Sequence, residues 1–241
     1  KKNGVRKFIF ASSCSMYGVT SSLSKTEKSK LNPLTAYAKS KVLAEKKLKK
    51  LSTSRFNVIC LRFATACGYS KNIRLDLVLN DFVASAMLNK EVVVLSDGSP
   101  WRPMIHVKDM ARAINWGLEQ KIKDPFLTVN AGSNAMNYQI KDIAKKVGKL
   151  IEGVNVSINS AALPDKRSYK VNFSKFERMN KKFKPIYNLE KSIIDLRNNY
   201  KKNKFKTKDF RNSQYIRLKV LEKLISNKSL NNNLYWNKKI K

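Results

Sequence analysis

A serine-rich segment and a Tyr-Lys pair lie close together near the start of the sequence. The segment SSCSMYG begins at Ser12, and Tyr37 lies 24 residues after Ser13, with Lys41 four residues further on. Tyr and Lys at this spacing share one face of a helix. An ammonium group beside a phenol favours the phenolate, the form that removes a proton from an alcohol. These residue types therefore predict general acid–base chemistry on a hydroxyl group.

The spacing of Tyr37 and Lys41 carries little information by itself in this chain. Five of the nine tyrosines have a lysine four residues later, as expected where lysine is so abundant. What distinguishes Tyr37 is its position, because it follows the serine-rich segment on the next predicted helix.

Strands and helices must hold these side chains in place. Residues 5–11, VRKFIFA, predict a strand buried on both faces, and the serines stand at its end. Pro33 precedes a predicted helix that runs to about Leu51 and carries Tyr37. In open α/β sheets, ligands bind outside the carboxyl ends of the strands. The small hydroxyl side chains are therefore expected to face a ligand crevice.

Strand and helix patterns continue to alternate along the chain. This alternation predicts an α/β fold with a doubly wound parallel sheet, and Asp76 is expected to cap one of the helices. From about Val154 the pattern changes to short strands and three basic helices, the last at residues 210–225. The other predicted strands are residues 56–63, 91–95 and 126–132, and the other predicted helices are residues 77–88, 107–120 and 137–151.

The chain is strongly basic, with 50 Lys and Arg against 17 Asp and Glu and a net charge of +33. Such a balance suits nucleic-acid binding, but the lysines are spread along the whole chain, which favours a solvated surface. The one distinct basic run, residues 199–211, interleaves Tyr200, Phe205 and Phe210. These aromatic rings could stack on bases or anchor a connector between two helices, and the second interpretation is preferred.

The three cysteines, Cys14, Cys60 and Cys67, show no CxxC spacing and are expected to be reduced thiols, which predicts a cytoplasmic protein. With His106 as the one histidine, no metal site is predicted. No apolar run approaches the roughly 20 residues of a membrane-spanning helix, so no membrane partner is expected.

Four ordered segments resemble the extended short-chain dehydrogenase/reductase family. They are FIFASSCSMYG, NPLTAYAKSK, VICLRFATACG and DGSPWRPMIHVKDMARA. Within that family the sequence is similar to the NAD-dependent nucleotide-sugar epimerases and dehydratases, such as UDP-galactose 4-epimerase. The resemblance implies a partial NAD-binding Rossmann domain at residues 1–153 and a smaller substrate lobe at residues 154–241. It also implies NAD rather than NADP as cofactor, a nucleotide-sugar substrate and a homodimer.

The resemblance assigns a role to individual residues. The expected catalytic residues are Ser13, Tyr37 and Lys41. The residues expected to contact NAD are Ala11, Ser12, Tyr37, Lys41 and Phe63. Those expected to contact the substrate are Ser13, Ser15, Thr65, Arg102, Arg167 and Tyr169. Ala162 stands where the family has an arginine, so Arg167 is expected to take its place, and His106 is expected to be structural.

The sequence departs from the family in two ways. The glycine-rich loop that holds the NAD pyrophosphate is missing, because the chain has eight glycines and no G-x-x-G-x-x-G. The chain also begins with Lys1, so it is expected to be an N-terminally truncated piece that is inactive alone. In the dehydratases an Asp-Glu pair follows the catalytic serine or threonine, whereas this chain has Cys14 and Ser15. The sequence therefore predicts epimerisation, or a related oxidation or reduction, without loss of water.

Two other function classes are compatible with the sequence. A nucleic-acid-binding protein would use the basic surface, and the salt dependence of its RNA binding would identify it. A non-catalytic subunit with an NAD-binding fold would be identified by titration with NAD in the absence of turnover.

Overall fold

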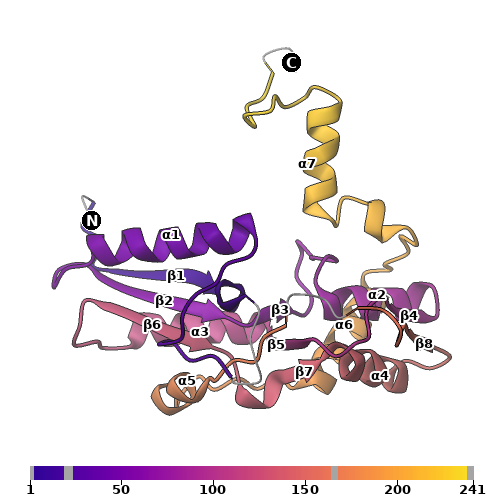
Figure 1. Ribbon diagram of the computed structural model, residues 1–241, viewed down its shortest axis with the longest axis horizontal. Helices are drawn as coiled ribbons and strands as arrows, with labels where there is room; N and C mark the ends of the chain where they lie inside the picture. Colours follow the sequence, from indigo (N-terminus) through magenta and orange to yellow (C-terminus); the bar gives the residue numbers. More distant parts are fainter. Residues whose placement is uncertain (1–2, 19–23, 164–167, 238–241) are drawn as a thin grey trace.

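The computed structural model describes residues 3–18, 24–163 and 168–237. Its N-terminal half is built on a parallel sheet in which β2 (Asn57–Phe63) lies between β1 (Lys7–Ser13) and β6 (Phe126–Ala131). Helix α1 (Ala36–Leu51) covers one face of this sheet and α3 (Val107–Glu119) covers the other (Figure 1). Parallel strands joined through helices on both faces are the doubly wound arrangement, so the predicted α/β class is confirmed.

The burial predictions for β2 and β1 have different outcomes. Strand β2 is central, and all of its residues except Asn57 are buried, as its apolar sequence indicates. Strand β1 was expected to be buried on both faces, and this is wrong, since Phe8 is 40% exposed and Ala11 is exposed as well. Among the described residues β1 has a strand partner on one side only, which leaves its other edge open to solvent.

Short strands extend the structure beyond the parallel sheet. Strand β5 (Trp101–His106) pairs in parallel with β3 (Thr65–Cys67) and antiparallel with β7 (Asn137–Gln139), and β4 (Glu91–Val94) pairs with β8 (Asn155–Ile158). The helix predicted to begin at residue 137 therefore begins later, because its first three residues belong to β7. A strand of three residues is too short to show an alternating pattern.

A second hydrophobic core lies among α2 (Val78–Leu88), α4 (Ile140–Leu150) and α6 (Leu189–Lys202). The expected cap by Asp76 is wrong: Leu77 precedes α2 without a side-chain cap, and Asp76 instead pairs with Arg74. The boundary between residues 153 and 154 stays a prediction. Packing crosses it, because side chains of β8 contact the same core as α2 and α4.

The basic run with aromatic residues, residues 199–211, connects two helices, as the preferred interpretation predicts. Tyr200 and Phe210 are 1% and 0% exposed, and Phe205 packs against the same core. The helix predicted at residues 210–225 is divided into a short turn, η3 (Phe210–Asn212), and α7 (Arg217–Ser226). The remaining short elements are η1 (Cys14–Tyr17), η2 (Asn134–Met136) and α5 (Ser174–Met179).

His106 is fully buried at the start of α3, where its ring holds several elements together. Nδ1 accepts a hydrogen bond from the backbone of Lys108 and Nε2 lies 3.2 Å from Asp195 Oδ2. The ring also stacks on Tyr187, with centroids 3.8 Å apart. Gly68 packs directly on this ring: a Cβ there would lie 2.3 Å from His106 Nε2.

Replacing Gly68 by alanine is expected to lower the free energy of unfolding by about 1–3 kcal/mol through overpacking, in addition to the strain of its φ of +100°. Gly153→Ala is the matched control, because Gly153 has a φ of +70° with nothing within 4 Å of the added Cβ. Urea unfolding of both variants measures the difference. Equal losses would show that backbone strain, and not contact with His106, explains the effect.

Candidate active site

A cavity of about 1140 Å³ opens at the carboxyl ends of β1 and β2. This is larger than the roughly 300–1,000 Å³ of most small-molecule pockets, so it suits a large ligand or two ligands together. Every predicted site residue that the structure describes lines this cavity, and Arg167 lies outside the described residues. The residues brought together are Ala11, Ser12, Ser13, Ser15, Tyr37, Lys41, Phe63, Thr65, Arg102 and Tyr169.

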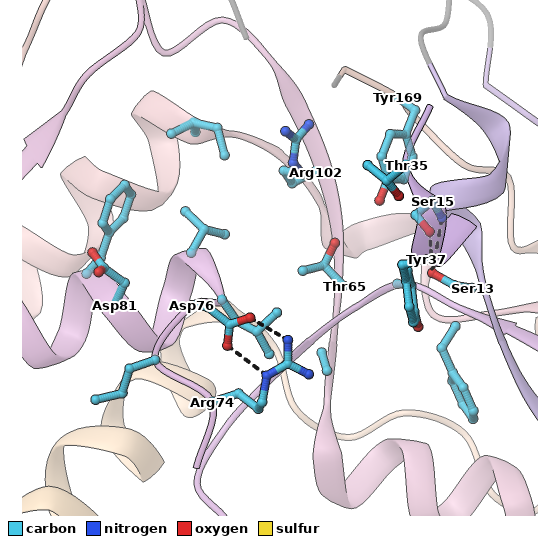
Figure 2. Close-up of a pocket in the computed structure, with 18 of the residues that line it drawn as sticks. Ser13, Ser15, Thr35, Tyr37, Thr65, Arg74, Asp76, Asp81, Arg102 and Tyr169 are labelled. Carbon is cyan, nitrogen blue, oxygen red and sulfur yellow. Dashed lines mark hydrogen bonds and ion pairs between the residues drawn. The ribbon is translucent and has the colours of Figure 1, made fainter. Parts of the chain in front are cut away.

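The serine-rich segment turns at the end of β1 so that two hydroxyls face the cavity. Ser13 pairs with Phe63 at the last position of the sheet, and its Oγ accepts a hydrogen bond from the backbone of Ser15. The Oγ atoms of Ser13 and Ser15 lie 2.9 Å apart. Figure 2 shows these two residues at the same end of the cavity as Tyr37 and Tyr169.

Helix α1 places Tyr37 and Lys41 over this strand end. Thr35 begins the helix by accepting a hydrogen bond from the backbone of Ala38, and Tyr37 is therefore in the first turn, 56% exposed. Lys41 lies one turn later. Its Nζ donates to the carbonyl oxygen of Ala11 at 2.8 Å and lies 5.4 Å from the centroid of the Tyr37 ring. The predicted pair thus shares one helix face beside the end of β1.

A buried ion pair fixes the next turn of α1 to the sheet. Glu45 and Arg62 are 5% and 6% exposed, and both nitrogens Nε and Nη2 of Arg62 donate to the Glu45 carboxylate, the shorter distance being 2.7 Å. Since Glu45 is four residues after Lys41, this pair fixes the rotation and height of α1 relative to β2. Sequence analysis did not identify it.

Tyr17 and Asn130 continue this buried network toward β6. Arg62 Nη1 donates to the Tyr17 hydroxyl, which donates in turn to Asn130 Oδ1 at 2.6 Å. Burial raises the pKa of Tyr17 well above its usual range, so the phenol keeps the proton it donates. The polar groups beneath the cavity are therefore paired with one another, which holds η1, α1 and the sheet in one arrangement.

Arg102 and Tyr169 lie next to each other in the cavity wall, with Tyr169 at the end that also holds the two serines (Figure 2). The Arg102 guanidinium lies 5.7 Å from the centroid of the Tyr169 ring, and its Nη1 donates to the carbonyl oxygen of Trp101. The backbone of Tyr169 also donates to that same oxygen. A guanidinium held beside an aromatic ring is suited to a ligand that combines phosphate groups with a planar base.

Sequence reasoning missed two ion pairs that line the same cavity. Arg74 holds Asp76 through two hydrogen bonds, and Arg211 holds Asp81 through two bonds of 2.8 Å (Figure 2 labels the first pair and Asp81). Burial alone would raise the pKa of Asp76, but the hydrogen bond from Arg74 lowers it below its usual value. The Arg-x-Asp spacing just after β3, at a strand end, was the available signal.

Cys14 lies next to Ser13 in sequence but outside the cavity. Its side chain is completely buried, its Sγ donates to the carbonyl oxygen of Arg62, and burial raises its pKa. Cys60 and Cys67 are likewise buried and unpaired. In the part of the chain that the structure describes, no cluster of three or more His, Cys, Asp and Glu side chains is placed to hold a metal ion.

Comparison with known proteins places these features in one family. The profile of the NAD dependent epimerase/dehydratase family matches residues 1–132. A Methanocaldococcus jannaschii protein named "Putative UDP-glucose 4-epimerase" is 26% identical over 153 residues, which are 60% of this chain and 48% of that protein. The match thus spans about half the length of this relative.

Solved structures share the fold. UDP-glucose 4-epimerase from Bifidobacterium longum, in complex with NAD+ and UDP, has a TM-score of 0.69 at 24% identity, covering 84% of this chain and 66% of its own. UDP-glucuronic acid 4-epimerase from Bacillus cereus, in complex with UDP-glucuronic acid and NAD, has a TM-score of 0.67 at 21% identity, covering 82% and 62%. The chain spans less than two thirds of either structure.

Proposed function

The chain belongs to the NAD-dependent epimerase/dehydratase family, and from this premise we propose that the whole protein epimerises a nucleotide-diphosphate sugar through a keto-sugar intermediate. The observation that carries the proposal is the convergence of Ser13, Tyr37 and Lys41 on one cavity, at the end of β1. By the whole protein we mean this chain together with any residues that flank it.

Tyr37 is the proposed acid–base residue. Its exposed phenol lines the cavity, with the ammonium group of Lys41 5.4 Å from the centroid of its ring, and its oxygen would take the proton from a sugar hydroxyl. Ser13 would donate a hydrogen bond to the same sugar oxygen and so hold it in line with the phenolate. When the keto-sugar has turned over, its carbonyl carbon would receive the hydride on the other face, and Tyr37 would return the proton to the same oxygen.

The cavity fits the nicotinamide end of NAD. Ala11, Ser12 and Phe63 form its wall at the carboxyl ends of two parallel strands, where α/β folds bind dinucleotides. Lys41 Nζ, already directed to the carbonyl oxygen of Ala11, would donate to a ribose hydroxyl there. Bound there, NAD would supply the hydride acceptor and donor for the sugar carbon. We propose NAD rather than NADP.

The remaining cavity residues suit the nucleotide half of the substrate. Arg102 would bind the diphosphate, because a guanidinium can pair with two phosphate oxygens at once. Tyr169, next to Arg102, would contact the base or its ribose. Thr65 lies between Arg102 and Tyr37 in Figure 2, which suits contact with the sugar ring, and the ion pair Arg74–Asp76 lines the cavity below Thr65 in the same view.

The buried state of Cys14 supports epimerisation rather than dehydration. Expelling water from a keto-sugar needs an additional acid and base next to Ser13, and Cys14 points away from the cavity with a raised pKa. Ser15, which does line the cavity, is a poor proton donor near neutral pH. We therefore expect a product of unchanged mass when the whole protein is incubated with NAD and UDP-, GDP-, CDP- or dTDP-hexoses.

Mass spectrometry and NMR of the products test this directly. A product lighter by one water would rule out the assignment as an epimerase and leave a dehydratase. The absence of any conversion, together with tight binding of NAD, would favour a non-catalytic subunit. A product oxidised or reduced by two hydrogens would place the protein with the related oxidoreductases.

The homodimer and compartment predictions remain part of this proposal. Three buried cysteines without disulfides fit a reducing compartment, so we propose a cytoplasmic protein. The homodimer is proposed on the family resemblance alone. A nucleic-acid function is less well supported, because the aromatic rings of the basic run are packed in the core and are not available for stacking on bases.

A further inference from the structure

Helix α7 and the turn that follows it stand away from the rest of the molecule (Figure 1). No α7 residue is buried, and none of its side chains belongs to a hydrophobic cluster of the described chain. Residues 227–237 form a compact turn closed by an antiparallel bridge between Leu230 and Trp236. The backbone N–H of Leu230 donates to the carbonyl oxygen of Leu224, so the turn is attached to the end of the helix.

This projecting unit presents apolar side chains to solvent. Leu218, Leu221 and Ile225 follow a three- and four-residue spacing and so share one face of α7. Leu218 is 64% exposed, and Leu221 and Ile225 are half-buried. The turn adds Tyr235 and Trp236, which are 71% and 64% exposed. An apolar helix face that ends in exposed aromatic rings is typical of helices that lie in a membrane interface.

The polar side of the same unit is cationic. Lys219 and Lys223 lie four residues apart on another face of α7, and both are exposed. Residues 199–241 contain 13 Lys and Arg against two Asp and Glu, the acidic residues being Asp209 and Glu222. The charge density of this segment is therefore well above the chain's own high average.

We propose that α7 and its turn dock on an anionic lipid surface. A lipid interface offers both an apolar layer for the leucines and the tryptophan and a negative surface for the lysines. A second copy that docked through this same unit would bring the same strongly basic segment against it, so a homodimer contact is expected at another surface. A nucleic acid offers no favourable environment for Leu218. This docking departs from the expectation of no membrane partner, which rested on the lack of a spanning segment. Among the described helices, none has the length and apolar character needed to span a bilayer.

Vesicle sedimentation with the full chain tests the proposal. In about 0.15 M salt, where attraction between distant charges is screened, the chain should bind phosphatidylcholine vesicles that contain phosphatidylglycerol and not vesicles of phosphatidylcholine alone. Replacing Leu218 and Trp236 together by serine should weaken binding at least about tenfold. Leu43→Ser is the matched control, because Leu43 is an exposed leucine of α1, 57% accessible, and its loss should change nothing.

Tryptophan fluorescence gives a second readout that does not depend on net charge. Trp236 is exposed, Trp116 is buried and Trp101 is half-buried, so a blue shift on vesicle binding that disappears in Trp236→Phe would locate the contact. Equal binding by the serine double variant and the wild type would overturn the proposal and leave general charge attraction. A dimer that the double variant dissociates, or capture of RNA in preference to vesicles, would overturn it in favour of those partners.

Discussion

Tyr37→Phe is expected to lower kcat of the whole protein by about a hundredfold or more, which is the usual scale for loss of a general acid–base residue. The ring and its place beside Lys41 are kept, so binding of the nucleotide sugar should remain close to that of the wild type. Steady-state kinetics and calorimetric titration of UDP-sugar measure the two effects separately.

The matched control for this variant is another tyrosine with the same spacing to a lysine. Tyr235, four residues before Lys239, is 71% exposed and lies outside the cavity, so Tyr235→Phe should keep wild-type turnover. If Tyr37→Phe also keeps wild-type turnover, the proposed acid–base role is wrong. If it abolishes sugar binding instead, Tyr37 holds the substrate and does not transfer the proton.

Glu45→Gln is expected to lower the free energy of unfolding by about 3–5 kcal/mol, the usual result of leaving one member of a buried ion pair without its partner. Arg62 would remain buried with its charge uncompensated. Chemical unfolding monitored by circular dichroism measures the change. Because this pair also positions α1, kcat should fall in the fraction that stays folded.

Two further variants separate the effect of leaving a buried charge unpaired from the effect of removing a charge in general. Glu119→Gln breaks an exposed ion pair with Lys182 and should lower the free energy of unfolding by only about 0–1 kcal/mol. Replacing Glu45 by leucine and Arg62 by methionine together should restore much of the stability, because neither charge is then left unpaired. A loss in Glu45→Gln no larger than in Glu119→Gln would contradict the structural role of the pair.

Local sequence was sufficient to predict the residues that stand at strand ends and helix starts. The position of Ser13 after an apolar run, and of Tyr37 on the next helix, follows from patterns a few residues long. Asp76 shows the limit of such patterns, because an aspartate before a helix can cap it or pair with a nearby arginine. Arg74 is two residues away, and Asp76 pairs with it and does not cap the helix.

Features that depend on contacts between distant segments could not be predicted from the sequence. The exposure of β1 depends on which strands lie beside it, and an apolar run does not encode its neighbours. Arg211 reaches Asp81 across 130 residues, and no spacing rule relates them. Arg62 and Glu45 were each unremarkable in sequence, one within an apolar strand and the other among lysines, and only the packing of α1 on β2 joins them.

The reaction of the three buried thiols with a reagent can report when the structure opens locally. Cys14, Cys60 and Cys67 are each 0% exposed, and burial raises the pKa of Cys67 to about 12, so a thiol reagent can react only when the structure opens. Each thiol reports on a different segment, η1, β2 or β3. The order in which the three thiols of the native protein become alkylated therefore ranks these segments by their opening free energies, and no substitution is needed.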